Sequence, residues 1–335
     1  MLNFTKIREA LKARIREVDT TAFEPLALEV FQYQAAHNPL YRRYLELLGR
    51  QPDTVQHLAD IPFLPIALFK KHIIQTGEWE PEVVFSSSGT TGTTTSKHRL
   101  RSKAFYRQSA RRGFETFYGR LKDYCVLALL PSYLERSGSS LVFMVEDFIR
   151  QSGHPDSGFF LYNTDELLQI LQKCQKSQQP TLLIGVSFAL LNLAEAHPVD
   201  LSGIIIMETG GMKGRRRELT RSELHHRLQA AFNVPSIHSE YGMTELLSQA
   251  YARRKGLFNP APTMRVAARE RTDPFQLQPP GRTGALNITD LANIDTISFI
   301  ATDDLGRVYE DHSFEVLGRL DASDVRGCNL MVADL

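Results

Sequence analysis

Residues 86–97 read SSSGTTGTTTSK and directly follow the apolar run 83–85. Glycines let a backbone approach a ligand closely, and hydroxyl and free N–H groups suit phosphate oxygens. A Walker A loop is excluded, because no Gly-Lys-Ser/Thr follows the first glycine at the required distance. The segment predicts a phosphate-binding loop, with a flexible surface loop as the alternative. The predicted contacts are Ser87, Ser88, Gly89, Thr90, Thr91, Gly92 and Lys97.

From residue 80 onward, short apolar runs alternate with helical patterns. Strands are expected at 83–85, 124–130, 181–184, 203–207 and 236–238, and helices at 165–174, 188–196 and 221–232. This alternation predicts a largely parallel sheet covered by helices. Residues 3–48 show helical spacing with a break at Asn38-Pro39, and after Gly284 only strand patterns remain, at 285–288, 296–300 and 313–317. We therefore expect an α/β fold with a layered strand–helix core and a β-rich C-terminal subdomain.

The same patterns divide the chain into parts. We expect a helical lead over residues 1–79, packed on an α/β domain over 80–317 that becomes β-rich from about 284, and a short final segment over 318–335.

Further short segments carry groups suited to a nucleotide. Residues 241–245 read YGMTE, 302–306 read TDDLG, 318–321 read GRLD, and a glycine pair occupies 210–211. A hard cation bound to phosphates usually takes one or two protein carboxylates, which Glu245 can supply. Taken separately, 302–306 and 318–321 each read as an acidic turn. Their order along the chain after the loop at 86–97 favours one shared site.

Together these segments resemble the signature motifs of the acyl-adenylate-forming superfamily, which includes acyl-CoA synthetases, luciferases and peptide-synthetase adenylation domains. The resemblance covers residues 80–327 and implies the large-domain fold of these enzymes, with ATP and Mg²⁺ as cofactors. The loop departs from the usual pattern, because it is longer and lacks the proline before Lys97. Asp303 also replaces the usual glycine beside Asp304.

The resemblance also implies roles for the matched residues. Lys97 and the hydroxyl loop would neutralise the β- and γ-phosphates, Thr244 would contact the α-phosphate, and Glu245 would help to hold Mg²⁺. The other implied nucleotide contacts are Gly210, Gly211, Tyr241 and Gly242 near the adenine, and Asp304 and Arg319 on the ribose.

Within the superfamily, the chain most resembles the LuxE-type acyl-protein synthetases. The helical lead, IPFLP at 61–65, LPSYLER at 130–136 and ETGGMKG at 208–214 carry this resemblance. It implies activation of a long-chain fatty acid to acyl-AMP, then transfer to a protein cysteine, with an acyl-accepting reductase or carrier protein as a possible partner. The GRLD segment at 318–321 resembles the hinge motif that precedes a mobile C-terminal domain in most members of the superfamily. Few residues follow it here, so we expect that domain to be absent or vestigial.

Composition and cysteine content indicate the cellular location, the excluded kinds of partner and a candidate acyl carrier. The chain has 335 residues, a net charge of +1 and 3 cysteines. Near-neutral charge argues against nucleic acid as a partner, and no apolar run is long enough to span a membrane. With no signal peptide pattern, we expect a cytoplasmic protein. Cys328 is the expected acyl carrier, and packing as a small apolar group is its alternative.

Other readings stay open at this point. They are an acyl-CoA ligase of the phenylacetate-CoA ligase type, a non-catalytic nucleotide- or acyl-binding relative, and a serine thioesterase. The last would use Ser187 in GVSFA at 185–189, where Ala189 replaces the glycine of a nucleophile elbow. A plain strand–helix turn with Ser187 as helix cap is favoured. Among the histidines, His98 adjoins the loop and is a candidate phosphate contact, whereas His225 is expected at the surface.

Overall fold

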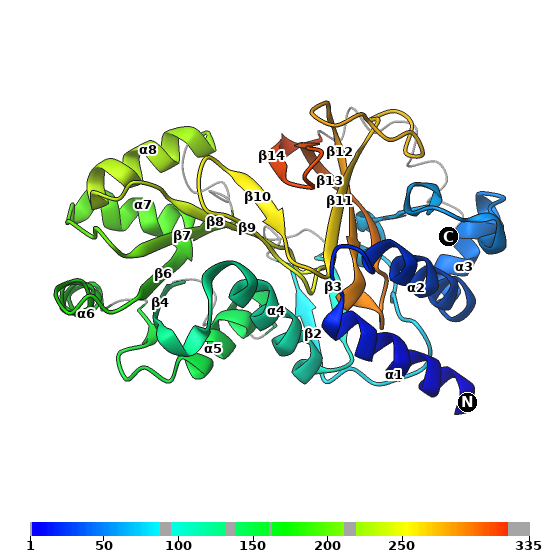
Figure 1. The fold of residues 1–335 in the computed structure, drawn as a ribbon, viewed down its shortest axis with the longest axis horizontal. Helices are drawn as coiled ribbons and strands as arrows, with labels where there is room; N and C mark the ends of the chain where they lie inside the picture. The colour runs from blue at the N-terminus through cyan, green and yellow to red at the C-terminus, as the bar shows by residue number, and fades with distance from the viewer. Residues whose placement is uncertain (1, 88–94, 131–137, 161–162, 211–218, 321–335) are drawn as a thin grey trace. The chain divides into compact units, whose positions relative to one another are not determined.

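The computed structural model describes residues 2–87, 95–130, 138–160, 163–210 and 219–320 and shows a mixed α/β fold (Figure 1). The predicted fold class is confirmed. The chain divides into two compact units, which are described separately. The first unit contains residues 1–109, 244–248 and 260–335, and the second contains residues 110–243 and 249–259. The domain boundaries predicted from the sequence stay a prediction.

The first unit starts with three helices and is built around an antiparallel sheet. The helices are α1 (Leu2–Glu17), α2 (Phe23–His37) and α3 (Pro39–Leu47), and Asn38 breaks the chain as predicted, its side chain accepting a hydrogen bond from the Tyr41 N–H. The sheet has the order β11 (Met264–Arg269), β12 (Thr283–Asp290), β13 (Phe299–Val308) and β14 (Phe314–Arg319), and β1 (Leu64–Pro65) pairs in parallel with β13.

The second unit has the predicted parallel sheet. Its strand order is β5 (Gly158–Phe159), β4 (Cys125–Leu129), β6 (Thr181–Val186), β7 (Ile205–Thr209) and β8 (His238–Tyr241). The order continues with β9 (Ala250–Ala252), which is antiparallel to β8, and then β10 (Leu257–Pro260). Every residue of β4 and β6 is buried, which explains their unbroken apolar sequences. Figure 1 shows α7 (Ser187–Ala196) and α8 (Arg221–Phe232) on one face and α5 (Ser140–Ser152) on the other.

Some elements were not predicted. Among them are α4 (Lys103–Tyr118), α5, and the strands β9, β10 and β11, which come before residue 284 in the chain. Helix α6 (Thr164–Lys176) agrees with the prediction, and α8 begins with a full capping box between Thr220 and Glu223. Within the described residues, no helix combines the length and the apolar character that a membrane crossing requires.

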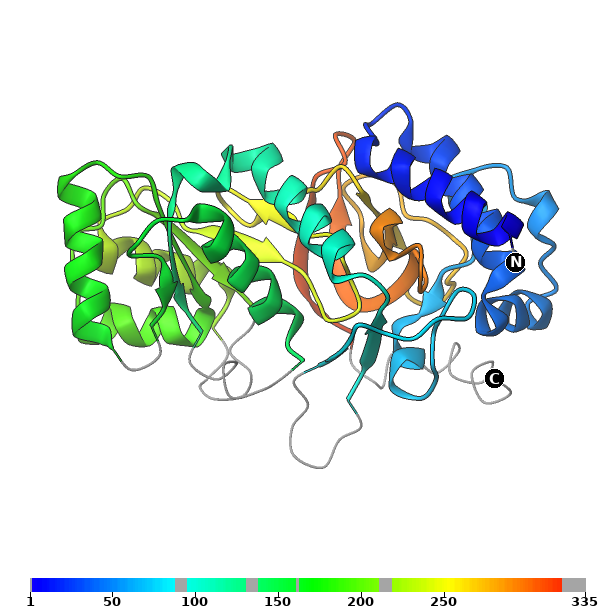
Figure 2. The ribbon, with the colours of Figure 1, turned by 90° about the horizontal axis from the view of Figure 1, so that it is seen from below.

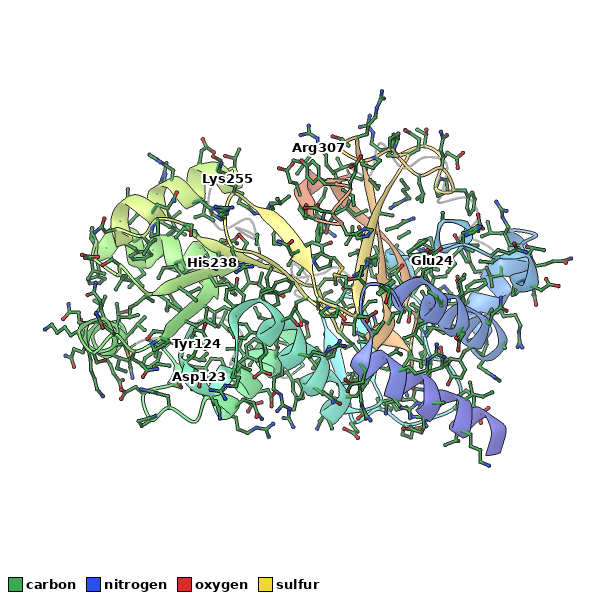
Figure 3. The ribbon with its side chains drawn as sticks, viewed as in Figure 1. Glu24, Asp123, Tyr124, His238, Lys255 and Arg307 are labelled. Atoms are coloured by element: carbon green, nitrogen blue, oxygen red, sulfur yellow. The ribbon has the colours of Figure 1, made fainter. Side chains whose placement is uncertain are left out.

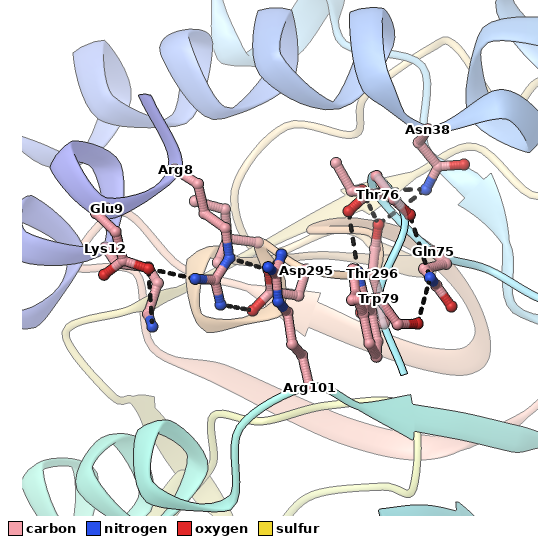
Figure 4. A network of polar contacts seen from close by, with 12 residues as sticks. Arg8, Glu9, Lys12, Asn38, Gln75, Thr76, Trp79, Arg101, Asp295 and Thr296 are labelled. Atoms are coloured by element: carbon pink, nitrogen blue, oxygen red, sulfur yellow. Dashed lines mark hydrogen bonds and ion pairs between the residues drawn. The ribbon is translucent and has the colours of Figure 1, made fainter. Parts of the chain in front are cut away.

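A buried ion pair ties α1 to the first unit (Figure 4). Arg8 donates from Nε and Nη2 to the two carboxylate oxygens of Asp295, at 2.5 and 2.6 Å. Arg101 approaches the same carboxylate at 3.4 Å, and the Arg8 side chain is only 6% exposed. Asp295 lies in the turn between β12 and β13, so the pair fixes the N-terminal helix to the edge of the sheet.

Candidate active site

The hydroxyl-rich segment is the connection of a two-stranded hairpin. Strands β2 (Val83–Ser86) and β3 (Lys97–Leu100) pair antiparallel, with Ser86 opposite Lys97. The Ser87 N–H donates to the Ser96 carbonyl at 3.1 Å, and the Ser96 N–H donates to Ser87 Oγ at 2.9 Å. These bonds close the base of the predicted phosphate loop, and Lys97 stands exposed beside it. Five predicted contacts lie outside the described residues: Ser88, Gly89, Thr90, Thr91 and Gly92.

Glu245 is brought to this hairpin within the first unit. The Ser96 side chain hydrogen-bonds to the Glu245 carboxylate, and Arg319 and Lys70 act on it electrostatically. Glu245 is 6% exposed, and this burial raises its pKa above the ordinary value, while the Ser96 hydrogen bond partly opposes the shift. The structure therefore gathers residues from three sequence motifs: the loop, YGMTE and GRLD.

His98 has a different role from the phosphate contact considered in the sequence. Its side chain is fully buried and bonds to the Thr244 carbonyl oxygen through Nδ1 at 2.8 Å and to Thr296 Oγ1 through Nε2 at 3.1 Å. Alternation along β3 explains the difference, because Lys97 and His98 point to opposite faces and only Lys97 is exposed. Burial lowers the pKa of His98 to about 4, so the ring is neutral at physiological pH.

Asp304 and Arg319 face each other across two antiparallel strands. They are partners in the register of β13 and β14, and Arg319 Nε lies 3.4 Å from Asp304 Oδ1. Residues 302–306 are therefore part of a strand, which corrects the reading of this segment as an acidic turn. Because side chains alternate along β13, Thr302 and Asp304 lie on one buried face while Asp303 points the other way.

Because Asp303 and Asp304 point to opposite faces of β13, we expect their substitution to affect ATP affinity differently. We expect Asp304→Ala to weaken ATP binding by about 2–4 kcal/mol, the value of two charge-assisted hydrogen bonds to ribose hydroxyls. Asp303→Ala, on the opposite face, should change the affinity much less and is the matched control. Calorimetric titration with ATP gives both constants. A larger loss in the Asp303 variant would show that the ribose contact is assigned to the wrong residue.

In the second unit, predicted adenine contacts lie at the carboxyl edge of the parallel sheet. Strands β7 and β8 are neighbours, with Thr209 opposite Glu240, so Gly210 and Tyr241 lie side by side where the strands end. Ligands of parallel α/β sheets bind at this edge. Gly210 has φ of +68°, a conformation that glycine adopts without strain. Gly211 lies outside the described residues.

Gly242 lies too close to the Glu240 side chain for a larger residue to fit without displacing it. A Cβ atom at this position would lie 2.5 Å from Glu240 Oε1. Glu240 is buried, accepts a hydrogen bond from the Thr209 hydroxyl, and has its pKa raised to about 7 by burial. The backbone at Gly242 is itself exposed, so any larger side chain would either displace Glu240 or cover this edge.

The structure around Ser187, in the second unit, argues against the interpretation as a serine thioesterase. Ser187 is 2% exposed, and its single hydroxyl proton is shared between Glu208 Oε2 at 2.9 Å and the Gly210 carbonyl oxygen at 2.8 Å. The acceptors are a backbone carbonyl and the Glu208 carboxylate, not the histidine base of a hydrolase triad, and His225 and Arg221 lower the pKa of Glu208, which makes it a weak base. The residue is also the first of α7 rather than its cap, since Val186 is the N-cap.

His225 was expected at the surface, and the structure corrects this. It is 8% exposed, its Nε2 lies 3.5 Å from Glu208 Oε1, and it contacts Ser239 Oγ at 3.3 Å. The hydrogen bond to His225 and the charge of Arg221 outweigh burial and lower the pKa of Glu208. The sequence held a usable signal: Leu224, His225, Leu228 and Phe232 share the buried face of α8. His238, which lies on β8 (Figure 3), hydrogen-bonds to the Tyr118 hydroxyl at 3.1 Å.

Two of the cysteines are poor acyl carriers. Cys125 and Cys174 are both buried, and burial together with the Cys174 side chain raises the pKa of Cys125 to about 12. A thiol with so high a pKa is almost entirely protonated at neutral pH. Cys328 lies outside the described residues, so its role stays a prediction. Among described side chains, no cluster of three or more His, Cys, Asp or Glu residues could hold a metal ion.

Similar proteins are known for this chain, although no protein-family model matches it. The long-chain-fatty-acid–luciferin-component ligase of Vibrio harveyi is 23% identical over 327 residues, covering 90% of this chain and 85% of the relative. An open conformation of 2-hydroxyisobutyryl-CoA ligase, in complex with 2-HIB-AMP and CoA, has a TM-score of 0.66 at 16% identity, covering 92% of this chain and 78% of that one.

ATP-bound MatB from Rhodopseudomonas palustris shows the same fold, with a TM-score of 0.54 at 17% identity. The match covers 72% of this chain and 49% of MatB, so this chain spans about half the length of that protein. Together with the relative from Vibrio harveyi, these structures confirm the predicted fold class and the resemblance stated from the sequence.

Proposed function

We propose that the chain, which has the fold of adenylate-forming enzymes, is an acid ligase that activates a long-chain fatty acid with ATP and then passes the acyl group to a protein cysteine. The observation that carries this proposal lies in the first unit, where the Ser96 side chain hydrogen-bonds to the Glu245 carboxylate, Arg319 acts electrostatically on that carboxylate, and Arg319 is paired to Asp304. These residues come from all four sequence motifs to which the resemblance assigns contacts with phosphate, metal or ribose.

The first step needs positioning and charge neutralisation more than covalent help from the protein. A carboxylate oxygen of the acid attacks the α-phosphorus of ATP, the bond to the β-phosphate bridging oxygen breaks, and pyrophosphate leaves. Lys97, exposed at the base of the loop, would meet the charge that collects on the leaving group. Asp304 and Arg319 would hold the ribose, and Thr244 would contact the α-phosphate.

The residues present also fit Mg²⁺. Burying the Glu245 carboxylate at 6% exposure is costly without a cationic partner, and its raised pKa reflects that cost. Oxygen ligands of this kind suit a hard cation, and one protein carboxylate is enough when phosphates supply the other ligands. When bound, the ion neutralises phosphate charge. Glu245 would hold it, with Ser96 fixing the carboxylate by its hydrogen bond.

In the second step a cysteine thiolate attacks the acyl carbon, a thioester forms, and AMP leaves with the bonding electron pair. The buried Cys125 and Cys174 do not suit this step. Cys328 is the proposed carrier on this chain, close in sequence to Arg326, whose positive charge favours a thiolate.

Acid-dependent exchange of labelled pyrophosphate into ATP tests the first step. We expect exchange with fatty acids of increasing length and little with short hydrophilic acids. Formation of an acyl-CoA thioester, with release of AMP, when CoA is added would favour the acyl-CoA ligase alternative. Nucleotide binding without exchange for any acid would instead indicate a non-catalytic relative.

The second step is tested with Cys328→Ser. We expect the wild-type protein, incubated with ATP, Mg²⁺ and labelled fatty acid, to become labelled through a hydroxylamine-sensitive bond. The variant should lose the label and keep its pyrophosphate exchange, because serine is a far weaker nucleophile than a thiolate. Cys174→Ser, which changes a buried thiol, is the control and should still be labelled. Thiol labelling of the Cys328 variant would place the carrier elsewhere.

A further inference from the structure

Residues 244–248, which carry Thr244 and Glu245, belong to no helix or strand. On both sides the chain belongs to the second unit, while these residues are part of the first. A segment without ladder hydrogen bonds must be fixed by other contacts if its side chains are to hold one geometry. We infer that His98, Asp290 and Asn293 are positioning residues that hold this segment, and the inference rests on the proposed function.

The first contact is made by His98. A carbonyl oxygen only accepts hydrogen bonds, so the 2.8 Å contact to the Thr244 oxygen places the ring proton on Nδ1. Nε2 then carries no proton and accepts a hydrogen bond from the Thr296 hydroxyl at 3.1 Å. One neutral tautomer satisfies both partners, and its burial keeps it neutral. His98 thus connects the hairpin strand β3 directly to the residue before Glu245.

The second and third contacts come from the turn that follows β12. Asn293 donates from Nδ2 to the Glu245 carbonyl oxygen at 2.8 Å. Asp290 Oδ2 accepts from the N–H groups of Leu247 and Ser248 at 2.7 and 2.9 Å, and its Oδ1 accepts from the Ser248 hydroxyl at 2.5 Å. Asp290 and Asn293 have no exposed surface, so water does not compete for these bonds.

The turn that supplies these groups is itself firmly held. Its backbone is tied to Thr263, whose carbonyl accepts from the Leu291 N–H at 2.9 Å, and to Ser298 through the Asp290 N–H at 2.7 Å. Gln34 of α2 donates to the carbonyls of Asn293 and Ile294 at 3.0 and 3.1 Å. The segment 244–248 is therefore hydrogen-bonded to a turn that is itself buried and fixed by hydrogen bonds.

The supports affect the proposed reaction by fixing the positions of Thr244 and Glu245. A displacement of about 1 Å in a catalytic group can cost ~100-fold in rate, even when the mutated residue is remote from the chemistry. Each support bonds to the backbone of residues 244–248, and the one side chain of the segment that is bonded as well is the buried Ser248 hydroxyl, which is not among the proposed substrate contacts. Loss of a support should therefore lower the turnover number more than it changes the KM for ATP.

Two substitutions of His98 separate positioning from general packing. Asparagine places an amide N–H near the position of Nδ1 and keeps the donor to Thr244, whereas glutamine reaches only the position of Nε2 and loses it. We expect His98→Gln to lower the exchange turnover about 100-fold and His98→Asn to stay within about tenfold of the wild type, at similar unfolding temperatures. Asn293→Asp, which replaces the donor to Glu245 by an acceptor, should resemble His98→Gln.

The outcomes are distinct. Equal turnover in the glutamine and asparagine variants, or losses that only follow the unfolding temperature, would overturn the positioning role. A change confined to the KM for ATP would overturn it too, because it would indicate direct binding. A wild-type protein without acid-dependent exchange would overturn the proposed function, and the inference with it.

Discussion

Glu245→Gln is expected to lower acid-dependent pyrophosphate exchange by at least ~100-fold, the effect of losing one positioned charge on a developing anion. Glutamine keeps the shape and can still bond to Ser96, so packing changes little. It cannot supply the negative charge that the proposed Mg²⁺ site requires. Exchange rates at saturating acid and ATP, measured over a range of Mg²⁺ concentrations, give the size of the loss and show whether excess metal restores part of it.

The control for this variant is Glu80→Gln, because the Glu80 side chain is 97% exposed and pairs only loosely with Arg99, at 3.7 Å. It should exchange at the wild-type rate. Lys97→Ala is expected to match the loss in the Glu245 variant, with the exposed Lys71→Ala as its own control. Wild-type rates in both the Glu245 and the Lys97 variants would remove the assignment of the phosphate site.

The sequence predicted those parts of the site that are encoded in short segments. The loop at 86–97 was recognised from its composition and from the strand before it, and the structure shows the hairpin that such a segment forms. Glu245 is assigned to the candidate site from five consecutive residues, and its role stays a prediction. Neither prediction required knowledge of which distant residues come together.

The supports of residues 244–248 could not be predicted in this way. His98 contacts a carbonyl 146 positions along the chain, and Asn293 contacts one 48 positions away. A lone histidine or asparagine has no local pattern that names its partner, so only the folded sheet reveals the contact. Strand alternation did hold a hint for His98, since it must face away from Lys97.

The fold itself was predicted best where burial is complete on both faces. Strands β4 and β6 consist of buried residues and appear in the sequence as apolar runs. In β11, by contrast, buried residues alternate with partly exposed ones and arginines stand at 265 and 269, so its sequence resembles a loop. Arg269 is buried there only because the carbonyls of Leu286 and Thr302 and the Asn287 side chain accept its hydrogen bonds.

The other large effect concerns stability and the helix α1. Arg8→Met should lower the free energy of unfolding of the first unit by about 3–5 kcal/mol, because it removes one partner of a buried ion pair and leaves the charge of Asp295 poorly compensated. Arg101, at 3.4 Å, remains close to that carboxylate. Methionine retains an apolar stem of similar length, so the loss reports the ion pair rather than a cavity.

The same helix offers a matched control. Arg14 pairs with Glu29, with Nη2 to Oε1 at 2.8 Å, but both side chains are about half exposed, at 50% and 51%. Arg14→Met should therefore cost no more than about 1 kcal/mol. Urea unfolding can be followed by the fluorescence of Trp79, the one tryptophan of the chain, whose indole donates to the Thr76 carbonyl at 3.0 Å and lies beside Arg101. Equal losses in the two variants would mean that the Arg8–Asp295 pair does not anchor the helix, since burial is the feature that distinguishes the two pairs.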